Sequence, residues 1–383
     1  SIILYFHLRS SYNSFVNMNI GINARHLIEH KLEGIGWYSF EILNRMVQLR
    51  PDDHFYFYYD RKIKPLVEGK NITNVIVYPS ARSPHLFRFW FDVRLPRLFK
   101  KNKIDFFFSP DGFISLATSI PQIAVIHDLN FEHYPNDVPK HILKYYKKYM
   151  PLFAKRAKKI VTVSDFSKKD ICGTYKVDQS KVSVIYNGGN SIYKPLEDNH
   201  KKQFKREQNQ KRPYFVYVGS LHKRKNIQRM FEAFNDFNKG GKFDLIVIGE
   251  PMWGKEFQRT QISSHIKILG RKSGIDLSRW VASSEALIYV SYFEGFGLPV
   301  LEGMMAGVPV ITSDITSIPE VGGEAVVYVD PFNVKSISNG MSIAIEKCDI
   351  YAKLGPIQAA KFSWDKAADE LNHIFNHDII DLD

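Results

Sequence analysis

The chain has 383 residues, which is enough for two domains of roughly 150–200 residues each rather than one ordinary core. Its content of 44% hydrophobic and 24% charged residues is typical of a globular protein and excludes a disordered or fibrous chain. Two cysteines, Cys172 and Cys348, cannot build a disulfide framework or a four-cysteine zinc site, so we expect a reducing compartment. No apolar run reaches the roughly 18–20 residues that cross a bilayer.

The net charge of +12 is confined to the first half of the chain. Residues 1–196 carry 29 Lys and Arg against 16 Asp and Glu, whereas residues 197–383 carry 23 against 24. A basic half indicates a polyanionic partner such as nucleic acid, anionic lipid headgroups or a phosphorylated substrate. Charge alone does not choose among these three.

Short apolar runs alternate with amphipathic segments along the whole chain. The sequence from Met18 reads like the start of a first strand, so we expect residues 1–17 to be an accessory extension. Helices are predicted over 38–50, 140–155 and 166–175. Strands are predicted over 19–24, 54–59, 74–78, 104–108, 123–126, 159–163 and 182–186, and then over 214–218, 243–248, 266–269, 286–290, 308–312 and 325–329.

A polar stretch at residues 197–212, with Phe204 as its one large apolar residue, has the composition of a linker or hinge. The alternation on either side predicts an α/β protein with two doubly wound, Rossmann-like domains whose parallel sheets are covered by helices on both faces. Such sheets bind ligands at the carboxyl ends of their strands. We therefore expect a central cleft between the two domains, suited to a two-substrate reaction.

The strongest motif is Glu294-Gly-Phe-Gly-Leu-Pro-Val-Leu-Glu302, between a predicted strand and a short predicted helix. Pro299 suits a first helical turn and Gly307 suits the position after the last turn. The glycines allow close backbone approach, and a helix start attracts phosphate. Carboxylates beside a phosphate site indicate a ligand that also carries hydroxyls, as sugars do. The alternative is a simple glycine turn with Glu302 in the first helical turn, where the helix dipole favours it.

The second motif, Val218-Gly-Ser-Leu-His-Lys-Arg-Lys-Asn226, again leads from a strand into a helix. Lys225 stands at the helix entry, where an anion would bind. The motif lacks the Gly-Lys-Ser/Thr ending of a Walker A loop. Alone, it could equally be a solvated basic turn.

Two further motifs lie in the first half. His127 and Asp128 follow a predicted strand and face the expected cleft, although a lone His at a strand end is more often a packed residue. Gly34 and Gly36 link the first strand to the first helix, where they would permit close backbone approach. Since the third glycine of the dinucleotide fingerprint is missing, NAD binding is only weakly supported.

Basic residues interleave with aromatic residues at 84–103 and 140–159. This pattern fits helices that lie on an anionic membrane surface, and it fits core helices with a basic solvent face equally well. No nucleic-acid motif accompanies them, so we rank a lipid surface above nucleic acid.

Together these motifs resemble the retaining glycosyltransferases of family 4, which have the GT-B fold. The resemblance extends from Met18 to nearly the end of the chain, and Glu294-x7-Glu302 is its most specific part. Supporting parts are the Gly-Ile-Gly loop, His127-Asp128, Val163-Ser-Asp-Phe-Ser167, Ile185-Tyr-Asn-Gly188, the 219–226 loop and Phe362-Ser-Trp364. The resemblance implies an acceptor domain at 18–196, a donor domain at 197–364 and a C-terminal helix, 365–383, that crosses back to the first domain.

The resemblance also implies site residues. His127 and Glu294 would be the catalytic pair, contacting the donor sugar as positioning and electrostatic groups. The donor-binding set would be Gly36, Ser220, Arg224, Lys225, Gly295, Phe296, Gly297, Leu298 and Glu302. Within this set, Glu302 would bind the ribose. The backbone amides of residues 295–298 would contact the sugar and the diphosphate, and Lys225 with Arg224 would stabilise the leaving diphosphate. Ser220 departs from many family members, which carry Arg there.

The resemblance implies transfer of a hexose without a metal or other cofactor. The Gly-Ser-Leu…Arg-Lys-Asn loop looks like that of bacterial mannosyltransferases of surface-polysaccharide synthesis. We therefore expect GDP-mannose as donor, a glycan or polyprenyl-diphosphate-linked acceptor, and a cytoplasmic location at the inner membrane face. The alternatives are a UDP-sugar donor, a nucleotide-sugar 2-epimerase of the same fold, and a non-catalytic polyanion-binding protein.

Overall fold

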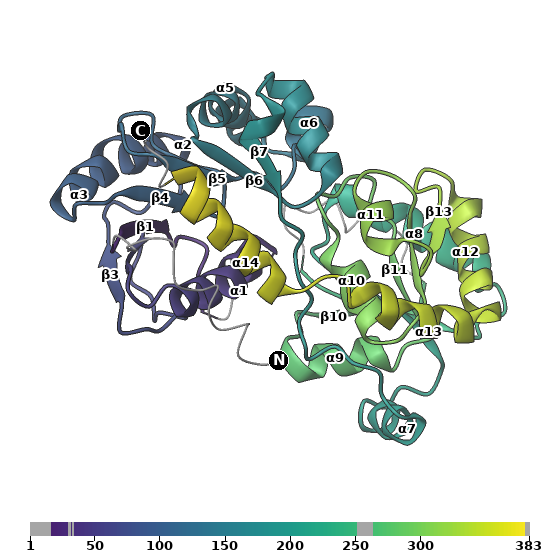
Figure 1. The fold of residues 1–383 in the computed structure, drawn as a ribbon. Coiled ribbons are helices and arrows are strands. Elements are labelled where there is room, and N and C mark those ends of the chain that lie inside the picture. Colours follow the sequence, from purple (N-terminus) through teal and green to yellow (C-terminus); the bar gives the residue numbers. More distant parts are fainter. Residues whose placement is uncertain (1–16, 30–31, 33, 251–262, 380–383) are drawn as a thin grey trace, which may run out of the picture. The chain divides into compact units, whose positions relative to one another are not determined.

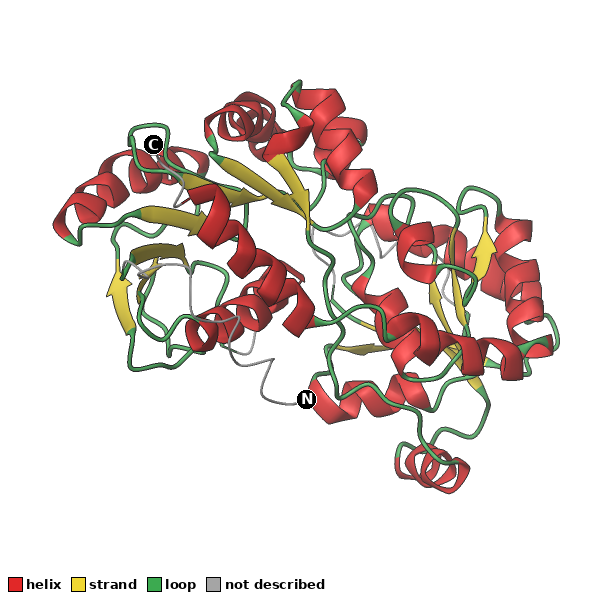
Figure 2. Ribbon diagram, in the orientation of Figure 1, coloured by secondary structure: helices red, strands yellow, loops and turns green. Residues whose placement is uncertain are grey.

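A computed structural model of the chain describes residues 17–29, 32, 34–250 and 263–379. The extension expected at 1–17 therefore lies almost wholly outside the described residues. Helices and strands alternate as predicted (Figures 1 and 2). They form two compact units, Ser1–Pro110 with Ile114–Ile123, and Asp111–Phe113 with Ala124–Asp383.

The first sheet has seven strands in the order β3-β2-β1-β4-β5-β6-β7. The pairs β1·β2, β1·β4, β2·β3 and β6·β7 are parallel, with Asn19 opposite His54 and Ile20 opposite Phe106. The strands are β1 (Asn19–Asn23), β2 (His54–Tyr59), β3 (Ile72–Ile76), β4 (Phe106–Ser109), β5 (Gln122–Val125), β6 (Lys159–Thr162) and β7 (Val182–Val184). Every residue of β4 and β5 is buried, as expected for a parallel strand with both faces covered.

The first basic aromatic segment is part of the core of its unit. It forms α2 (Pro84–Phe89), a π-helical turn (Trp90–Arg94) and α3 (Leu95–Lys101). Trp90, Phe91 and Phe99 are buried, and the guanidinium of Arg25 lies 4.8 Å from the Phe91 ring. Of the two interpretations of residues 84–103, the structure thus favours core helices over a membrane-surface helix, with Phe89 left exposed.

The second basic aromatic segment forms α5 (Lys140–Arg156). Tyr145, Met150 and Phe153 on this helix are buried, whereas Lys144, Lys147, Lys148 and Lys155 are exposed. It is a core helix with a basic outer face. That face keeps the lipid-surface prediction open for this segment alone.

The stretch predicted as a linker or hinge contains a helix, α7 (Asp198–Glu207), which the prediction did not include. Phe204 is buried and its ring meets that of Trp280 on α9 (Gly274–Ala282) at 5.2 Å. Gln210 then donates to the buried carboxylate of Asp244 at 2.8 Å. One apolar side chain is enough to anchor a polar helix when the neighbouring helix offers an aromatic partner, and composition does not reveal that partner.

The second sheet has six strands in the order β10-β9-β8-β11-β12-β13, paired in parallel. They are β8 (Tyr214–Val218), β9 (Asp244–Ile248), β10 (Ile266–Gly270), β11 (Ala286–Tyr289), β12 (Val310–Ser313) and β13 (Val327–Val329). In chain order, β7 is the last strand of the first sheet and β8 is the first strand of the second, and the boundary predicted at residue 196 lies between them. The limits predicted for the two domains remain predictions.

The second unit contains further helices, which lie beside strands of both sheets (Figure 1). They are α4 (Asn130–His133), α6 (Asp165–Tyr175), α8 (Ile227–Phe237), α10 (Leu298–Met305), α11 (Ile318–Gly322), α12 (Val334–Glu346), α13 (Cys348–Ala359) and α14 (Trp364–Ile374); the first unit adds α1 (Gly34–Leu49). Short helical turns occur at Pro135–Asp137, Gln179–Lys181, Lys223–Lys225 and Phe375–Ile379.

Two of the supporting motifs pack against each other. A Cβ atom on Gly188 would lie 2.1 Å from the Trp364 amide nitrogen, so only glycine fits where the chain enters α14. The ring of Tyr186 contacts that of Phe362 at 5.7 Å. The motifs at 185–188 and 362–364 therefore pack against each other. The predicted return of the last helix to the first domain remains a prediction.

Candidate active site

The Glu294 loop lies at the carboxyl edge of the second sheet. It leaves β11, which is buried along its whole length, and enters α10 through Gly297, whose φ of +96° demands glycine. Pro299 occupies the first turn of α10 and Gly307, with φ of +66°, follows its last turn, both as predicted. The amide groups at the start of α10 therefore point to this edge of the sheet with partial positive charge.

Glu294 holds two cations from the neighbouring loop. Its carboxylate accepts hydrogen bonds from Lys225 Nζ at 2.6 Å on Oε1 and from Arg224 Nη1 at 2.9 Å on Oε2. Tyr289 Oη, at the end of β11, donates to the same Oε1 at 3.0 Å. Glu294 is 5% exposed and Lys225 is 7% exposed, so this is a buried charge cluster.

The three charges shift one another's ionisation. Burial alone would raise the pKa of Glu294, but Arg224 and Lys225 outweigh it and lower the pKa to about 2. Burial, reinforced by Arg224, lowers the pKa of Lys225 to about 8, and Glu294 only partly opposes this. Burial also works against the charge of Arg224, yet Glu294 and Asp128 raise its pKa above the usual range. The carboxylate is thus firmly ionised, and Lys225 is the group that titrates near neutrality.

The backbone of the second motif is fixed by its own side chains. Asn226 has a left-handed φ of +60°, and its amide donates to the carbonyls of Val290 and Pro331 at 3.0 and 2.6 Å. His222 Nδ1 accepts from the Arg224 amide at 3.3 Å, which leaves Nε2 to donate to the Asp137 carbonyl at 3.0 Å. Burial and then Arg224 lower the pKa of His222, so it stays neutral. These contacts hold Arg224 and Lys225 directed at Glu294.

Ser220 follows β8 and is partly exposed, and its carbonyl accepts from Tyr217 Oη at 2.8 Å. As a serine it contributes no positive charge at this position. Arg224 and Lys225 are therefore the positive side chains that face Glu294 among the described residues.

The backbone of His127 lies beside the Glu294 loop. Gly295 approaches its backbone so closely that a Cβ atom there would lie 2.2 Å from the His127 carbonyl oxygen. The same carbonyl accepts from Ser167 Oγ at 3.0 Å. Asp128 is near enough to raise the pKa of Arg224 and Lys225. The structure thus brings together His127, Asp128, Arg224, Lys225 and Glu294.

Glu302 is placed differently from the prediction. Since α10 begins at Leu298, Glu302 is in the second turn and not the first, so the alternative that placed it where the helix dipole favours it does not hold, and its contact with the ribose remains a prediction. Burial raises its pKa to about 8, although a hydrogen bond from Tyr193 works in the opposite direction. Glu302 is therefore protonated at neutral pH in this arrangement.

Gly34 and Gly36 are placed differently from the prediction, whereas Phe296 keeps its predicted backbone role. Gly34 and Gly36 belong to the first turn of α1 and not to a loop, and a Cβ atom on Gly36 would lie 3.0 Å from the His26 carbonyl oxygen. Its proposed contact with the donor remains a prediction. The side chain of Phe296 packs with the rings of Tyr186 and Phe362 and is 4% exposed, so only its backbone is available to a ligand.

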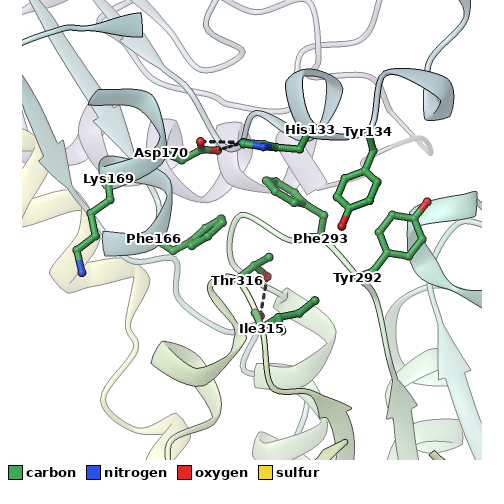
Figure 3. A pocket seen from close by; sticks show the side chains of 9 residues that line it. All are labelled: His133, Tyr134, Phe166, Lys169, Asp170, Tyr292, Phe293, Ile315 and Thr316. Atoms are coloured by element: carbon green, nitrogen blue, oxygen red, sulfur yellow. Dashed lines mark hydrogen bonds and ion pairs between the residues drawn. The ribbon is translucent and has the colours of Figure 1, made fainter. Parts of the chain in front are cut away.

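An aromatic pocket of about 740 Å³ lies next to the Glu294 loop (Figure 3). The ring of His133 stacks on Phe293 at 5.3 Å, and Tyr134 lies against Tyr292 at 4.7 Å. Asp170 accepts a hydrogen bond from His133 Nε2 at 2.8 Å, which Figure 3 shows at the pocket's edge. The full lining is His133, Tyr134, Phe166, Lys169, Asp170, Tyr292, Phe293, Ile315 and Thr316.

Sequence reasoning missed several residues of this site. Tyr289 ends a strand and reads as an ordinary core aromatic residue. Tyr193 meets Glu302, and Tyr292 Oη donates to Asp137 at 2.6 Å, across separations that one sequence cannot reveal. Their only local signal is a polar tip on an aromatic ring beside a glycine-rich loop, which is too common to be predictive.

The structure thus has two Rossmann-like sheets, with the buried Lys225, the partly buried Arg224 and a helix start at the carboxyl edge of the second, which suits a phosphate-bearing ligand such as a nucleotide sugar. The comparisons with known proteins agree. The model of Glycosyltransferase Family 4 matches residues 32–190, and that of Glycosyl transferases group 1 matches residues 198–358. The chain therefore belongs to the glycosyltransferases that combine these two domains.

Curated relatives include O-antigen chain mannosyltransferase B of Escherichia coli, 27% identical over 372 residues, which cover 90% of this chain and 96% of that protein. O-antigen chain mannosyltransferase RfbU of Salmonella typhimurium is 31% identical over 220 residues, 56% of this chain and 58% of that protein.

Solved structures share the fold at low identity. A glycosyltransferase from Rickettsia africae superposes with a TM-score of 0.71 at 16% identity, over 96% of this chain and all of that one. Anabaena HepE in complex with UDP and glucose gives 0.72 at 15% identity, over 94% of this chain and all of that one.

Two observations bear on partners. Within residues 17–29, 32, 34–250 and 263–379, no helix is both long enough and apolar enough to span a membrane. In the same ranges, no three His, Cys, Asp or Glu side chains are grouped so that they could hold a metal ion.

Proposed function

We propose that the protein transfers mannose from GDP-mannose, with retention of configuration, onto a glycan or polyprenyl-diphosphate-linked acceptor in bacterial surface-polysaccharide synthesis. The two O-antigen chain mannosyltransferases among its relatives support the sugar and the pathway. The observation that carries the proposal is the buried contact of Glu294 with Arg224 and Lys225 beside the start of α10.

The charges of this cluster suit the chemistry of transfer. As the bond between the anomeric carbon and the diphosphate breaks, negative charge develops on the phosphate and positive charge on the sugar. Arg224, Lys225 and the first amides of α10 stabilise the departing diphosphate. Since these groups supply the positive charge, we propose that the reaction needs no metal and that activity persists in EDTA; a strict metal requirement would contradict this.

Glu294 and His127 act on the sugar. Because the pKa of Glu294 is held near 2, its carboxylate is always ionised and can accept hydrogen bonds from donor hydroxyls. His127, which the close approach of Gly295 brings to the same loop, contacts the sugar near the reacting carbon. The leaving phosphate takes the proton of the acceptor hydroxyl on the same face, so no side chain forms a covalent intermediate.

The test is a thermal-shift panel of GDP-mannose, UDP-glucose and ADP-glucose, followed by product analysis. Because a ligand specific for the folded state raises the midpoint with its occupancy, GDP-mannose should give the largest shift. A larger shift with UDP-glucose favours the UDP-sugar alternative. Release of free epimerised sugar without an acceptor favours the 2-epimerase.

We also propose that the basic outer face of α5 brings the enzyme to an anionic membrane surface on the cytoplasmic side. The exposed Lys144, Lys147 and Lys148 supply its charge. Binding to vesicles that contain phosphatidylglycerol should weaken steeply as salt is raised. Replacement of these three lysines by Gln should abolish it, and equal binding by the variant and the wild type would refute the proposal.

A further inference from the structure

Glu320 on α11 is bound to the first turn of α6. Its Oε2 accepts the Asp165 amide at 2.8 Å and its Oε1 accepts the Phe166 amide at 2.6 Å. Amides at these positions of a helix have no intrahelical acceptor, and a carboxylate there is also favoured by the helix dipole. Glu320 therefore closes a helix end from another element, 155 residues away in sequence.

The same turn of α6 holds the backbone of His127. Ser164 caps the helix by accepting the Ser167 amide at 3.1 Å, and Ser167 is itself buried. Ser167 Oγ donates at 3.0 Å to the His127 carbonyl, the oxygen against which Gly295 packs. A shift of α6 along its axis would thus move the strand end that carries His127.

The residues just before Glu320 in the chain contact the backbone of Glu294. Three residues before it, Ser317 Oγ donates to the Glu294 carbonyl at 2.9 Å, and this hydroxyl is fully buried. The Glu294 amide in turn donates to Thr316 Oγ1 at 3.4 Å. The turn that precedes α11 therefore holds both backbone polar groups of Glu294.

Tyr186 strengthens the connection between α11 and α6. Its hydroxyl lies 3.2 Å from Glu320 Oε2 and 3.0 Å from Asp165 Oδ2. Burial and the two carboxylates raise its pKa, so the hydroxyl remains protonated and can donate to either acceptor. It bridges two like charges that would otherwise repel each other.

We propose that Glu320 is a positioning residue: by fixing the first turn of α6 to the turn before α11, it keeps His127 and Glu294 at the same positions relative to each other. Glu320 does not touch the donor or the acceptor in this proposal. The inference rests on the roles proposed above for His127 and Glu294.

The first experiment compares Glu320→Ala and Glu320→Gln with wild type, using GDP-mannose turnover, GDP binding and thermal unfolding. A displacement near 1 Å of a catalytic group costs on the order of 10²-fold in rate, so kcat should fall about 10- to 100-fold in the Ala variant. GDP affinity should stay within about threefold, because the cations and α10 are untouched. The Gln variant, which keeps an acceptor oxygen, should recover part of the loss. The exposed Glu324→Gln is the matched control.

A double-mutant cycle separates positioning from general destabilisation. If Glu320 acts through α6, its effect on kcat should not add to that of Ser167→Ala, and it should vanish in a His127→Ala background. Additive effects, normal kcat in Glu320→Ala, or a loss of GDP affinity equal to the loss of kcat would each overturn the proposal.

A readout without substrate keeps the inference testable if GDP-mannose is not the donor. In Glu320→Ala, amide hydrogen exchange should rise in segments 124–131 and 164–168, while segment 214–218 stays protected. Unchanged exchange in both segments would overturn the positioning role. Absence of turnover by the wild type would instead count against the proposed donor alone.

Discussion

Replacement of Glu294 by Gln tests the charge cluster in a way that can be calculated. The variant keeps the size of the side chain and one acceptor oxygen, but it leaves the buried Lys225 and the partly buried Arg224 without their counter-charge. Removing one partner of a buried ion pair costs about 3–5 kcal/mol. Because Gln still accepts one hydrogen bond, we expect about 3 kcal/mol, or a midpoint lower by roughly 6–12 °C.

An anion should reverse this loss. At about 100 times its Kd, pyrophosphate adds about 2.7 kcal/mol to the stability of the state that binds it. The two cations of Glu294→Gln are no longer occupied by a carboxylate, so pyrophosphate should raise its midpoint more than that of the wild type. GDP-mannose turnover should nevertheless be lost, because pyrophosphate cannot replace the contact with the sugar.

The assay is thermal unfolding with and without pyrophosphate, combined with turnover of GDP-mannose. Glu285→Gln is the control, since Glu285 pairs with Lys205 at 3.0 Å where both side chains are partly exposed, and an exposed ion pair contributes about 0–1 kcal/mol. A midpoint of Glu294→Gln within about 2 °C of the wild type, with an equal shift by pyrophosphate, would refute the reasoning.

Three further predictions concern neighbouring groups. Because the pKa of Lys225 is lowered to about 8, the pyrophosphate affinity of the wild type should fall between about pH 7 and pH 9. Lys225→Arg should have the same pyrophosphate affinity at both pH values, since Arg stays charged. A wild-type affinity that does not change with pH would contradict this prediction. Burial raises the pKa of Glu302 from 4.5 to about 8, so its protonated form contributes stability at low pH that is lost as the pH rises through 8. Glu302→Gln should therefore match the wild type near pH 5 and unfold at a higher temperature near pH 9. Identical unfolding midpoints near pH 9 would contradict the raised pKa of this carboxyl group. Gly295→Ala should lower both stability and turnover, because its Cβ would overlap the His127 carbonyl, and Gly173→Ala, which has open space, is the control that should do neither.

The strands were predictable because both faces of a parallel sheet are buried, which makes each strand a continuous apolar run. β8 and β2 have the predicted bounds. The start of β12 at Val310 instead of 308 shows that apolar residues before a strand look the same as those within it. Glycine and proline at the ends of α10 were informative because each fits one backbone geometry.

The tertiary partners were not predictable. The sequence reveals that Glu294 and Lys225 flank loops, but not that Tyr289 completes their cluster. The helix at 198–207 depends on Trp280, which is far away in sequence. Periodicity also cannot separate a helix buried in the core from one on a membrane, because both need an apolar stripe and a basic face.

The most direct measurement is a crystal structure with GDP bound. The account predicts the diphosphate at the start of α10, in contact with Lys225 and Arg224, with the ribose near Glu302. Density for the nucleotide at any other place, with the contact between Glu294 and the two cations undisturbed, would contradict it.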